Sequence, residues 1–328
     1  MKALVTGGGG FLGRYIVEKL LARGDAVRAM ARNRYPELEA AGAEMLQADI
    51  QDRDAVFRAC TGIDCVFHVA ALPLLWGPWE AFYGTNVVGT RHVIDACRTR
   101  GVGRLVYTST PSVVFADGDL ENADETLPYP EHHGASYPAT KAMAERAVVA
   151  ASGGDLLTAS LRPHLVWGPR DNHLIPRIVK RARAGQLVIV GDGRNKVDIT
   201  YVENAADAHL QAADRLEPGS PVAGQCYFIS QGEPVVLWDF LNQLLARLGL
   251  PAITRRLPYP AARALGAVLE TAHRVLKREG EPRMTRFLAA QLAHSHWFDI
   301  GKARRELGYV PRVSTAEGLD RLVSSLKP

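Results

Sequence analysis

A glycine-rich turn near the N-terminus constrains the fold of this chain more than any other feature. Apolar residues 3–5 precede four consecutive glycines, and an amphipathic segment at 14–23 follows Gly13. This order predicts a buried strand at 1–6, a tight turn and a helix that stops at Gly24. A strand, a glycine turn and a helix in this order form the phosphate-binding unit of dinucleotide-binding domains.

The spacing Gly7-x-x-Gly10-x-x-Gly13 gives each glycine its own predicted task. Gly7 allows the tight turn, Gly10 lets the backbone approach a pyrophosphate, and Gly13 lets helix and strand pack closely. Phe11 and Leu12 lie inside the motif, at a helix N-terminus suited to phosphate, and are expected to contact the cofactor too. A flexible loop would also explain the glycines, but the flanking patterns argue against it.

The composition is that of an ordinary globular protein. With 328 residues, 47% of them hydrophobic, the chain is long enough for an α/β core and an added lobe. The formal net charge of +4 is spread along the sequence, so no nucleic-acid partner is expected. The cysteines show no metal-site spacing, so no metal is expected and a reducing compartment fits. The first strand leaves no room for a signal peptide and no run of 18 apolar residues occurs, which predicts a cytoplasmic protein without a membrane span.

Strand and helix patterns alternate through the first half of the chain. Further strands are predicted at 26–31, 44–47, 65–69, 104–108 and 156–161, with helices at 55–59, 81–100 and 137–151. Short apolar strands joined by helices predict a Rossmann doubly wound parallel sheet, with ligand groups at the carboxyl ends of the strands. Residues 1–165 are therefore expected to form a dinucleotide-binding domain.

The alternation breaks down after residue 165. Helices are predicted at 173–184 and 203–215, short strands at 187–190 and 197–201, and the chain from 234 onward is mostly helical. Residues 166–194 and 231–328 are expected to form a smaller, mostly helical substrate lobe, while 195–230 return to the main domain. Within the first domain, the apolar segment 72–79 either covers a lipid-sized pocket or forms a satellite cluster. Arg170 either binds a substrate carboxylate or forms a structural salt bridge.

Residues after three strands predict the cofactor. Arg32 follows the second strand, where an NAD-binding chain would carry an acid. A guanidinium suits a 2′-phosphate, so NADP(H) is favoured over NAD(H), and a solvated basic turn is the alternative. Asp49 and Ile50 follow the third strand, where a carboxylate accepts a bond from the adenine amino group. The fourth strand ends in small residues that let the cofactor ribose lie close, namely Val69, Ala70 and Ala71.

The chemical groups follow the fifth strand. Thr110 lies in a hydroxyl-rich strand end, and Tyr137 and Lys141 open the next helix, where Pro138 suits the first turn. Tyr137 and Lys141 are four residues apart and so share one helix face. A cation near a phenol favours the ionised form, so Lys141 is expected to lower the pKa of Tyr137 and make it a proton donor.

A second tyrosine–lysine pair at the same spacing is Tyr15 and Lys19. We interpret it as structural, because its helix is committed to phosphate binding and no hydroxyl-bearing strand end precedes it.

Taken together, these motifs resemble the extended short-chain dehydrogenases/reductases. The resemblance rests on the glycine turn, Asn86 within 85–90, Thr110, Tyr137, Lys141 and the segment 162–169. Residues 107–115, 124–129 and 164–171 resemble the 3β-hydroxysteroid dehydrogenase branch. That branch includes sterol-4α-carboxylate 3-dehydrogenases and bacterial 2-alkyl-3-oxoalkanoate reductases. Thr110-Pro111-Ser112 and Trp76-Gly77 favour the bacterial reductases.

The resemblance implies an NADP(H)-dependent oxidoreductase that interconverts a 3-oxo and a 3-hydroxy group on a long-chain or polycyclic lipid. Tyr137 would supply the proton, Thr110 would hold the carbonyl oxygen, and Lys141 would also bind the ribose. Asn86 would brace a proton-relay water, and Pro163 and Val166 would position the carboxamide. The family usually has serine at position 110, so Ser109 or Ser112 are alternatives for that role. Related enzymes form homodimers through the helices predicted here at 81–100 and 137–151, so a homodimer is expected.

Two other classes remain as alternatives. A sugar-nucleotide epimerase or dehydratase would use the same scaffold. Dehydratases, however, carry acids where this chain has Pro111 and Ser112, and epimerases hold NAD through an acid that is missing here. A non-catalytic NADP-sensing protein would usually lack the pair formed by Tyr137 and Lys141.

Overall fold

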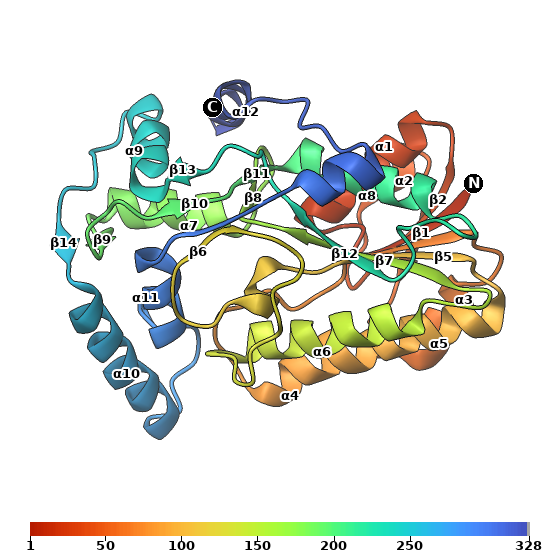
Figure 1. The fold of residues 1–328 in the computed structure, drawn as a ribbon, viewed down its shortest axis with the longest axis horizontal. Coiled ribbons are helices and arrows are strands. Elements are labelled where there is room, and N and C mark those ends of the chain that lie inside the picture. The colour runs from red at the N-terminus through yellow and green to blue at the C-terminus, as the bar shows by residue number, and fades with distance from the viewer. Residues whose placement is uncertain (327–328) are drawn as a thin grey trace.

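The computed structural model describes residues 1–326, and its largest element is a seven-stranded sheet in the order β12-β7-β5-β4-β1-β2-β3 (Figure 1). Every neighbouring pair in it is parallel. The strands are β1 (Lys2–Thr6), β2 (Ala26–Ala31), β3 (Glu44–Gln47), β4 (Cys65–His68), β5 (Arg104–Thr108), β7 (Leu157–Pro163) and β12 (Gln225–Ile229). The strand order reverses between β1 and β4, which is where ligands bind in such sheets.

Helices cover both faces of the sheet, as expected for buried parallel strands (Figure 1). On one face lie α1 (Phe11–Ala22) and α8 (Val202–Arg215), and on the other lie α3 (Arg53–Ala59), α5 (Gly89–Arg100) and α6 (Ser136–Ala151). Alternate residues of β1 enter the two cores: Ala3 and Val5 pack on one side and Leu4 on the other. The predicted doubly wound α/β fold is confirmed.

Several predicted boundaries differ from the structure. α1 begins at Phe11, three residues before the predicted start, because Gly10 is its N-cap. The helix predicted at 81–100 begins earlier, with α4 (Trp79–Phe82), and passes through a π-helical turn, η1 (Tyr83–Val88), into α5. Neither the helix α2 (Pro36–Ala40) nor the strand β12 was predicted from the sequence.

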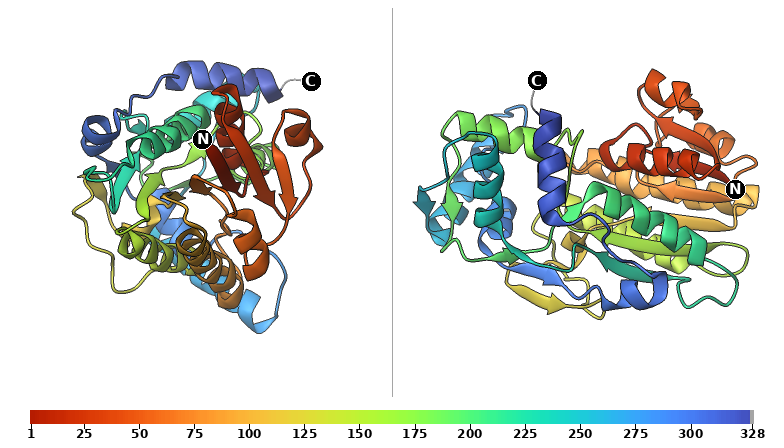
Figure 2. Two further views of the ribbon diagram at one scale, coloured as in Figure 1. Left: turned by 90° about the vertical axis from the view of Figure 1, so that its right-hand side faces the viewer. Right: turned by 90° about the horizontal axis from the view of Figure 1, so that it is seen from above.

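Figure 2 shows a second lobe beside the main sheet. This lobe has its own hydrophobic core and a four-stranded sheet. That sheet has the order β13 (Val235–Val236), β10 (Lys196–Val197), β15 (His296–Phe298) and β6 (Leu120–Ala123). Two further pairs are β8 (Val166–Trp167) with β11 (Thr200–Tyr201), and β9 (Ile189–Val190) with β14 (Arg256–Leu257). The helices are α7 (Leu174–Arg183), α9 (Leu237–Arg247), α10 (Tyr259–Val275), α11 (Arg286–Ala293) and α12 (Thr315–Leu326).

The chain crosses between the lobes more often than the expected division suggests. β6 lies within the first 165 residues but pairs with β15 of the second sheet. β10 and β11 lie in the small sheets, so the return to the main sheet begins at α8. Close to the C-terminus, η3 (Ala303–Leu307) and Tyr309 pack into the core of the first domain. No helix within residues 1–326 has the length and apolar character needed to cross a membrane.

Candidate active site

The glycine turn is packed tightly against the sheet and against α1. Gly7 has a φ of +69° and its N–H donates to the Met30 carbonyl at 2.8 Å. A Cβ on Gly7 would lie 2.8 Å from the Ala70 nitrogen, and one on Gly13 only 2.2 Å from the Gly7 oxygen. The N-cap residue Gly10 has no side chain to occupy the first N–H groups of α1. This end of α1 is therefore suited to phosphate.

Tyr35 lies over the same turn and was not predicted from the sequence. Its ring is so close that a Cβ on Gly9 would fall 1.9 Å from a ring carbon. The Arg14 guanidinium lies 5.5 Å from the ring centroid and forms an ion pair with Glu37. An aromatic residue just after a strand end was the only sequence signal, and it does not indicate which surface the ring covers.

The residues predicted to hold the adenosine half lie at the ends of β2 and β3. Arg32 is exposed, and its side chain forms no ion pair within the described chain, whereas nearby Arg34 is paired with Glu39. Asp49 is partly buried and accepts a bond from the backbone N–H of Gln51 at 2.8 Å. Ile50 is buried. Arg32 is thus the cation at this edge that remains available to a ligand.

The end of β4 is held by Thr6. The Thr6 carbonyl accepts from the Val69 N–H at 3.2 Å, and its hydroxyl accepts from the Ala70 N–H at 3.3 Å. Val69, Ala70 and Ala71 are all partly exposed. They lie beside the glycine turn, because Gly7 contacts Ala70 and Val69.

Lys141 projects from α6 under the end of β5. Its Nζ donates to the Thr108 carbonyl at 2.6 Å and lies 4.1 Å from the Tyr107 ring centroid. The side chain is only 2% exposed. Burial lowers the pKa of Lys141 to about 7, although the nearby Glu145 carboxylate opposes this shift.

Tyr137 lies one helical turn before Lys141, and its electrostatics differ from our expectation. Burial raises the pKa of Tyr137 to about 12, and the nearby Thr110 hydroxyl lowers it only in part. The expected lowering of the pKa by Lys141 does not occur in the chain alone, because burial is the largest influence on both groups. Thr110 and Tyr137, two of the predicted catalytic groups, nevertheless lie close enough for Thr110 to influence the pKa of Tyr137.

Thr110 caps a short 3₁₀ turn, η2 (Pro111–Val114), with its side chain. Its hydroxyl is 3.0 Å from that of Ser112 and accepts from the Ser112 N–H at 3.3 Å. Ser109, the other alternative, is buried, and its hydroxyl has no partner within the described residues. Thr110 is therefore the hydroxyl near Tyr137, and Ser112 supports Thr110.

Asn86 lies in the π-helical turn η1, with both polar atoms of its amide engaged. Its Oδ1 accepts from the Leu72 N–H at 2.8 Å, and its Nδ2 donates to the Thr140 hydroxyl at 3.0 Å. The amide therefore joins the start of the 72–79 segment to α6, next to Lys141. These contacts make Asn86 a positioning residue, and its expected role in bracing a relay water stays a prediction.

Pro163 and Val166 flank the end of β7. Pro163 is the last residue of that strand and pairs in register with Ile229 of β12. Val166 begins β8 and pairs with Thr200. Thr108 of β5 pairs with Leu161, so Thr110 and Pro163 follow at the same level of neighbouring strands.

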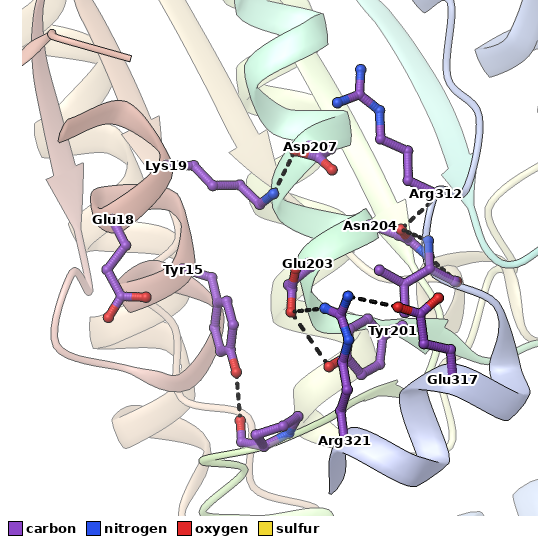
Figure 3. Close-up of polar contacts among 12 residues, drawn as sticks. Tyr15, Glu18, Lys19, Tyr201, Glu203, Asn204, Asp207, Arg312, Glu317 and Arg321 are labelled. Carbon is purple, nitrogen blue, oxygen red and sulfur yellow. Dashed lines mark hydrogen bonds and ion pairs between the residues drawn. The ribbon is translucent and has the colours of Figure 1, made fainter. Parts of the chain in front are cut away.

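Figure 3 shows why Tyr15 and Lys19 do not form a second site. The Tyr15 hydroxyl donates to the Pro169 carbonyl at 3.0 Å, while Lys19 forms an ion pair with Asp207 of α8 at 2.8 Å. The two side chains thus have different partners. Arg170 lies 4.2 Å from the Tyr15 ring centroid and is paired with Glu18, which favours the structural role over a substrate contact.

A cavity of about 380 Å³ lies between the segments that follow Thr110 and precede Tyr137. Its apolar side consists of Phe115, Phe287 and Ala290, a cluster on which Leu75 of the 72–79 segment also packs. Its polar side carries Asp117 together with two arginines and two histidines, namely Arg263, Arg286, His132 and His133. Sequence analysis did not identify these four residues, because they come together only when α10 and α11 pack beside the start of α6.

Arg286 and Arg263 differ in how firmly they are held. Arg286 is paired with the buried Glu270 at 2.8 Å, whereas Arg263 is 3.8 Å from the exposed Asp117. Both cations therefore have a neighbouring carboxylate, and Arg263 is the less constrained of the two.

Below the site, Glu145 and Arg162 form a buried ion pair that the sequence analysis also missed. Arg162 binds both carboxylate oxygens, with a shortest distance of 2.7 Å, and Tyr129 donates to the same carboxylate at 2.7 Å. Both charged side chains are at most 2% exposed. The pair fixes α6 to β7 and holds a negative charge one turn beyond Lys141.

The fold and this site define a class of protein, the nicotinamide-dependent oxidoreductases that act on CH–OH and C=O groups. The model of the 3-beta hydroxysteroid dehydrogenase/isomerase family matches residues 4–259, and the chain belongs to that family. Within the described residues, no cluster of three or more His, Cys, Asp or Glu side chains could hold a metal ion.

Curated relatives and solved structures agree with this assignment. The chain is 49% identical to the 2-alkyl-3-oxoalkanoate reductase of Stenotrophomonas maltophilia, over 99% of both chains. It is 34% identical to the human sterol-4-alpha-carboxylate 3-dehydrogenase, decarboxylating, over 99% of this chain and 88% of the relative. MoeE5 in complex with UDP-glucose and NAD has a TM-score of 0.75 and 26% identity, over 99% of this chain and 98% of that chain.

Proposed function

We propose that this protein is an NADP(H)-dependent 2-alkyl-3-oxoalkanoate reductase. The observation that carries the proposal is the position of Tyr137 near Thr110, one helical turn before the buried Lys141. A phenol protonated at neutral pH and a neighbouring hydroxyl suit proton donation to a ketone oxygen. The relative that carries the name of this activity is 49% identical along the whole chain.

The catalytic roles follow from the positions of the side chains. When bound, the reduced nicotinamide supplies the hydride. Thr110 holds the ketone oxygen, and Tyr137 donates the proton from its Oη atom. Lys141 binds a ribose hydroxyl and returns a proton to Tyr137. Asn86 positions α6 and the 72–79 segment around these groups through Leu72 and Thr140.

The cavity lined by Phe115 and His133 supports the proposal that the substrate is an acidic lipid. Its apolar side suits an alkyl chain, while Arg263, the less constrained of the two arginines, suits a carboxylate. A sterol-4α-carboxylate has the same combination of a 3-oxygen, a nearby acid and apolar bulk. That substrate class is therefore the second candidate, and it is favoured by the similarity to the human dehydrogenase.

Arg32 supports NADP(H) over NAD(H), because an exposed guanidinium outside any ion pair can bind a 2′-phosphate. The remaining cofactor contacts proposed here are Gly7, Gly10, Phe11, Leu12, Gly13, Asp49, Ile50, Val69, Ala70, Ala71, Tyr137, Lys141, Pro163 and Val166. The proposal also includes a cytoplasmic location.

A panel of substrates tests the proposed function. We expect NADPH oxidation with 2-alkyl-3-oxo acids to give a kcat/KM at least tenfold above that with 3-oxo sterol-4α-carboxylates. The reverse ranking would favour the sterol activity. No turnover with either class, in a protein that binds NADPH, would overturn both assignments.

A further inference from the structure

The outer side of α10 carries an apolar stripe along the length of the helix. Helix α10 lies at the edge of the second lobe, where α11 packs against one of its sides (Figure 1). That inner side holds the buried residues Ala262, Gly266 and Glu270. The positions on the opposite side recur every three or four residues, as expected for one face of a helix. This apolar stripe consists of Ala261, Ala264, Leu265, Val268, Thr271, Ala272 and Val275.

The apolar stripe leaves large apolar side chains in contact with solvent. Val268 and Val275 are 65% and 73% exposed. Leu265 within the stripe and Leu276 directly after the helix are exposed as well. Four such side chains on neighbouring turns form a continuous surface, and a continuous exposed apolar surface is typical of an interaction site.

The segment 72–79 extends this surface at the C-terminal end of α10. The Trp76 ring centroid lies 6.4 Å from that of His273 and 5.2 Å from the Arg274 guanidinium. Leu74, two residues before Trp76, is exposed. An aromatic ring and a further apolar side chain therefore lie beside the end of the stripe.

The unpaired charges at this end of α10 are mostly positive. Three exposed basic residues that form no ion pair within residues 1–326 occur here, namely Arg274, Lys277 and Arg278. The acids Glu270 and Glu281 are each paired with an arginine. This leaves Glu279 as the exposed acid of residues 259–283. The apolar stripe thus ends in a surface that attracts anions.

We propose that the apolar stripe of α10 docks on an anionic phospholipid bilayer, with the helix lying in the plane of the interface. An apolar helix face accompanied by lysine and arginine is typical of helices that bind in this way. The aliphatic side chains enter the boundary between headgroups and acyl chains, while the cations meet the lipid phosphates. The stripe lacks the paired acidic and basic flanks by which helices select a helical partner, which favours a bilayer over a second helix.

Docking would also bring the enzyme to the source of its proposed substrate. Arg263, Ala264 and Ala267 of α10 line a cavity of about 620 Å³. A long-chain lipid acid partitions into bilayers, so a docked α10 places this cavity beside it. This consequence rests on the proposed function, whereas binding to the bilayer does not.

Cosedimentation with lipid vesicles tests the proposal on the full chain without substrate. The probes are a vesicle of equal parts phosphatidylglycerol and phosphatidylcholine, and a vesicle of phosphatidylcholine alone. We expect the wild type to bind the anionic vesicle about tenfold more tightly or better, and this ratio to fall as salt screens the charges. In Val268→Asp/Val275→Asp, binding to the anionic vesicle should fall by about tenfold or more. In Lys277→Ala/Arg278→Ala, the preference for the anionic vesicle should shrink.

Val310→Asp is the matched control, because Val310 is similarly exposed and lies outside α10. It should bind vesicles as the wild type does. Urea unfolding of the Val268→Asp/Val275→Asp variant should match the wild type, because both valines face solvent. If neither substrate class is reduced, vesicle binding is still expected, so the two proposals fail separately.

Three results would overturn the inference. The first is a wild type that does not bind the anionic vesicle or binds both vesicles equally. The second is undiminished binding by Val268→Asp/Val275→Asp. The third is a wild-type dimer that dissociates in this variant, since a second copy of the chain would then cover the apolar stripe.

Discussion

Lys141 shows how strongly a residue's chemistry depends on where it is buried. Its ammonium donates to the Thr108 carbonyl and faces the Tyr107 ring, and burial lowers its pKa to about 7. The protonation state of Lys141 is therefore sensitive to any charge that enters the site. The spacing of Tyr137 and Lys141 predicted their proximity, but not their pKa values, because burial is a property of the whole fold.

The role of Tyr137 can be tested against its sequence counterpart Tyr15. Tyr137→Phe removes the proposed proton donor and should lower kcat by about 10²-fold or more, with NADPH binding retained. Tyr15→Phe removes only a bond to the Pro169 carbonyl, so kcat should stay within a few-fold of wild type. Single-turnover hydride transfer measured on both variants distinguishes these outcomes. A near-normal rate in Tyr137→Phe would contradict the mechanism.

Arg32 is the single residue proposed to bind the 2′-phosphate of NADPH. In Arg32→Ala, NADPH affinity should fall by about 10–100-fold because one charge-assisted contact is lost, while NADH affinity should change little. Arg34→Ala is the matched control, because Arg34 is paired with Glu39. If the preference for NADPH persists in Arg32→Ala, another residue recognises the phosphate.

For single elements, a local apolar pattern predicted several strands, whereas a strand defined by a distant partner was missed. The strands Ala26–Ala31, Glu44–Gln47 and Arg104–Thr108 were predicted at their observed bounds. Leu120–Ala123 was missed because three of its four residues are polar or small, and pairing with β15 is what makes it a strand. Likewise, the cavity arises from contacts between distant elements, which local sequence patterns do not specify.

The close packing of α1 against the turn that follows β1 can be tested by adding a methyl group at Gly13. In Gly13→Ala the new Cβ would fall 2.2 Å from the Gly7 carbonyl oxygen, so helix and turn must separate. We expect a loss of about 1–3 kcal/mol in the free energy of unfolding, together with weaker NADPH binding. Gly118→Ala, where a Cβ meets nothing within 4 Å, should change stability by less than about 0.5 kcal/mol. Urea unfolding compares the two, and equal effects would contradict the close-packing explanation.

For the stability of the entire fold, the buried acid Asp198 matters because it links the segment after β10 to β15. It is buried, its N–H donates to the His296 carbonyl, and its Oδ2 accepts from the Phe298 N–H at 2.8 Å. Burial raises the pKa of Asp198 to about 7. Because the folded state holds this proton more tightly than the unfolded state does, its contribution to stability is complete below about pH 4 and is lost as the pH rises towards 7.

Asp198→Asn should remove this pH dependence while keeping an oxygen for the Phe298 N–H. Relative to the variant, the wild type should lose up to about 1.4 kcal/mol of unfolding free energy per pH unit between pH 4 and 7. Urea unfolding at a series of pH values measures the difference. Parallel pH profiles for the two proteins would show that Asp198 is ionised throughout.

We also propose a homodimer formed through α5 and α6, which lie side by side along one face of the molecule (Figure 1). Light scattering at micromolar concentration should give twice the mass of the 35.7 kDa chain. An Ala-to-Glu substitution on the exposed side of α6, at Ala150, should yield monomers. A wild-type protein that is already monomeric would contradict the proposal.

The C-terminal region returns to the main sheet, and this limits how the two lobes can be exchanged between related proteins. Phe298 stacks on Phe228 of β12 at 4.1 Å between ring centroids, and Tyr309 donates to the Ser230 carbonyl. A fragment that ends before residue 298 would leave this surface of the nucleotide-binding half uncovered. The second lobe is thus joined to the first by several chain crossings, and a chimaera that exchanges this lobe between relatives must join the two chains at each crossing.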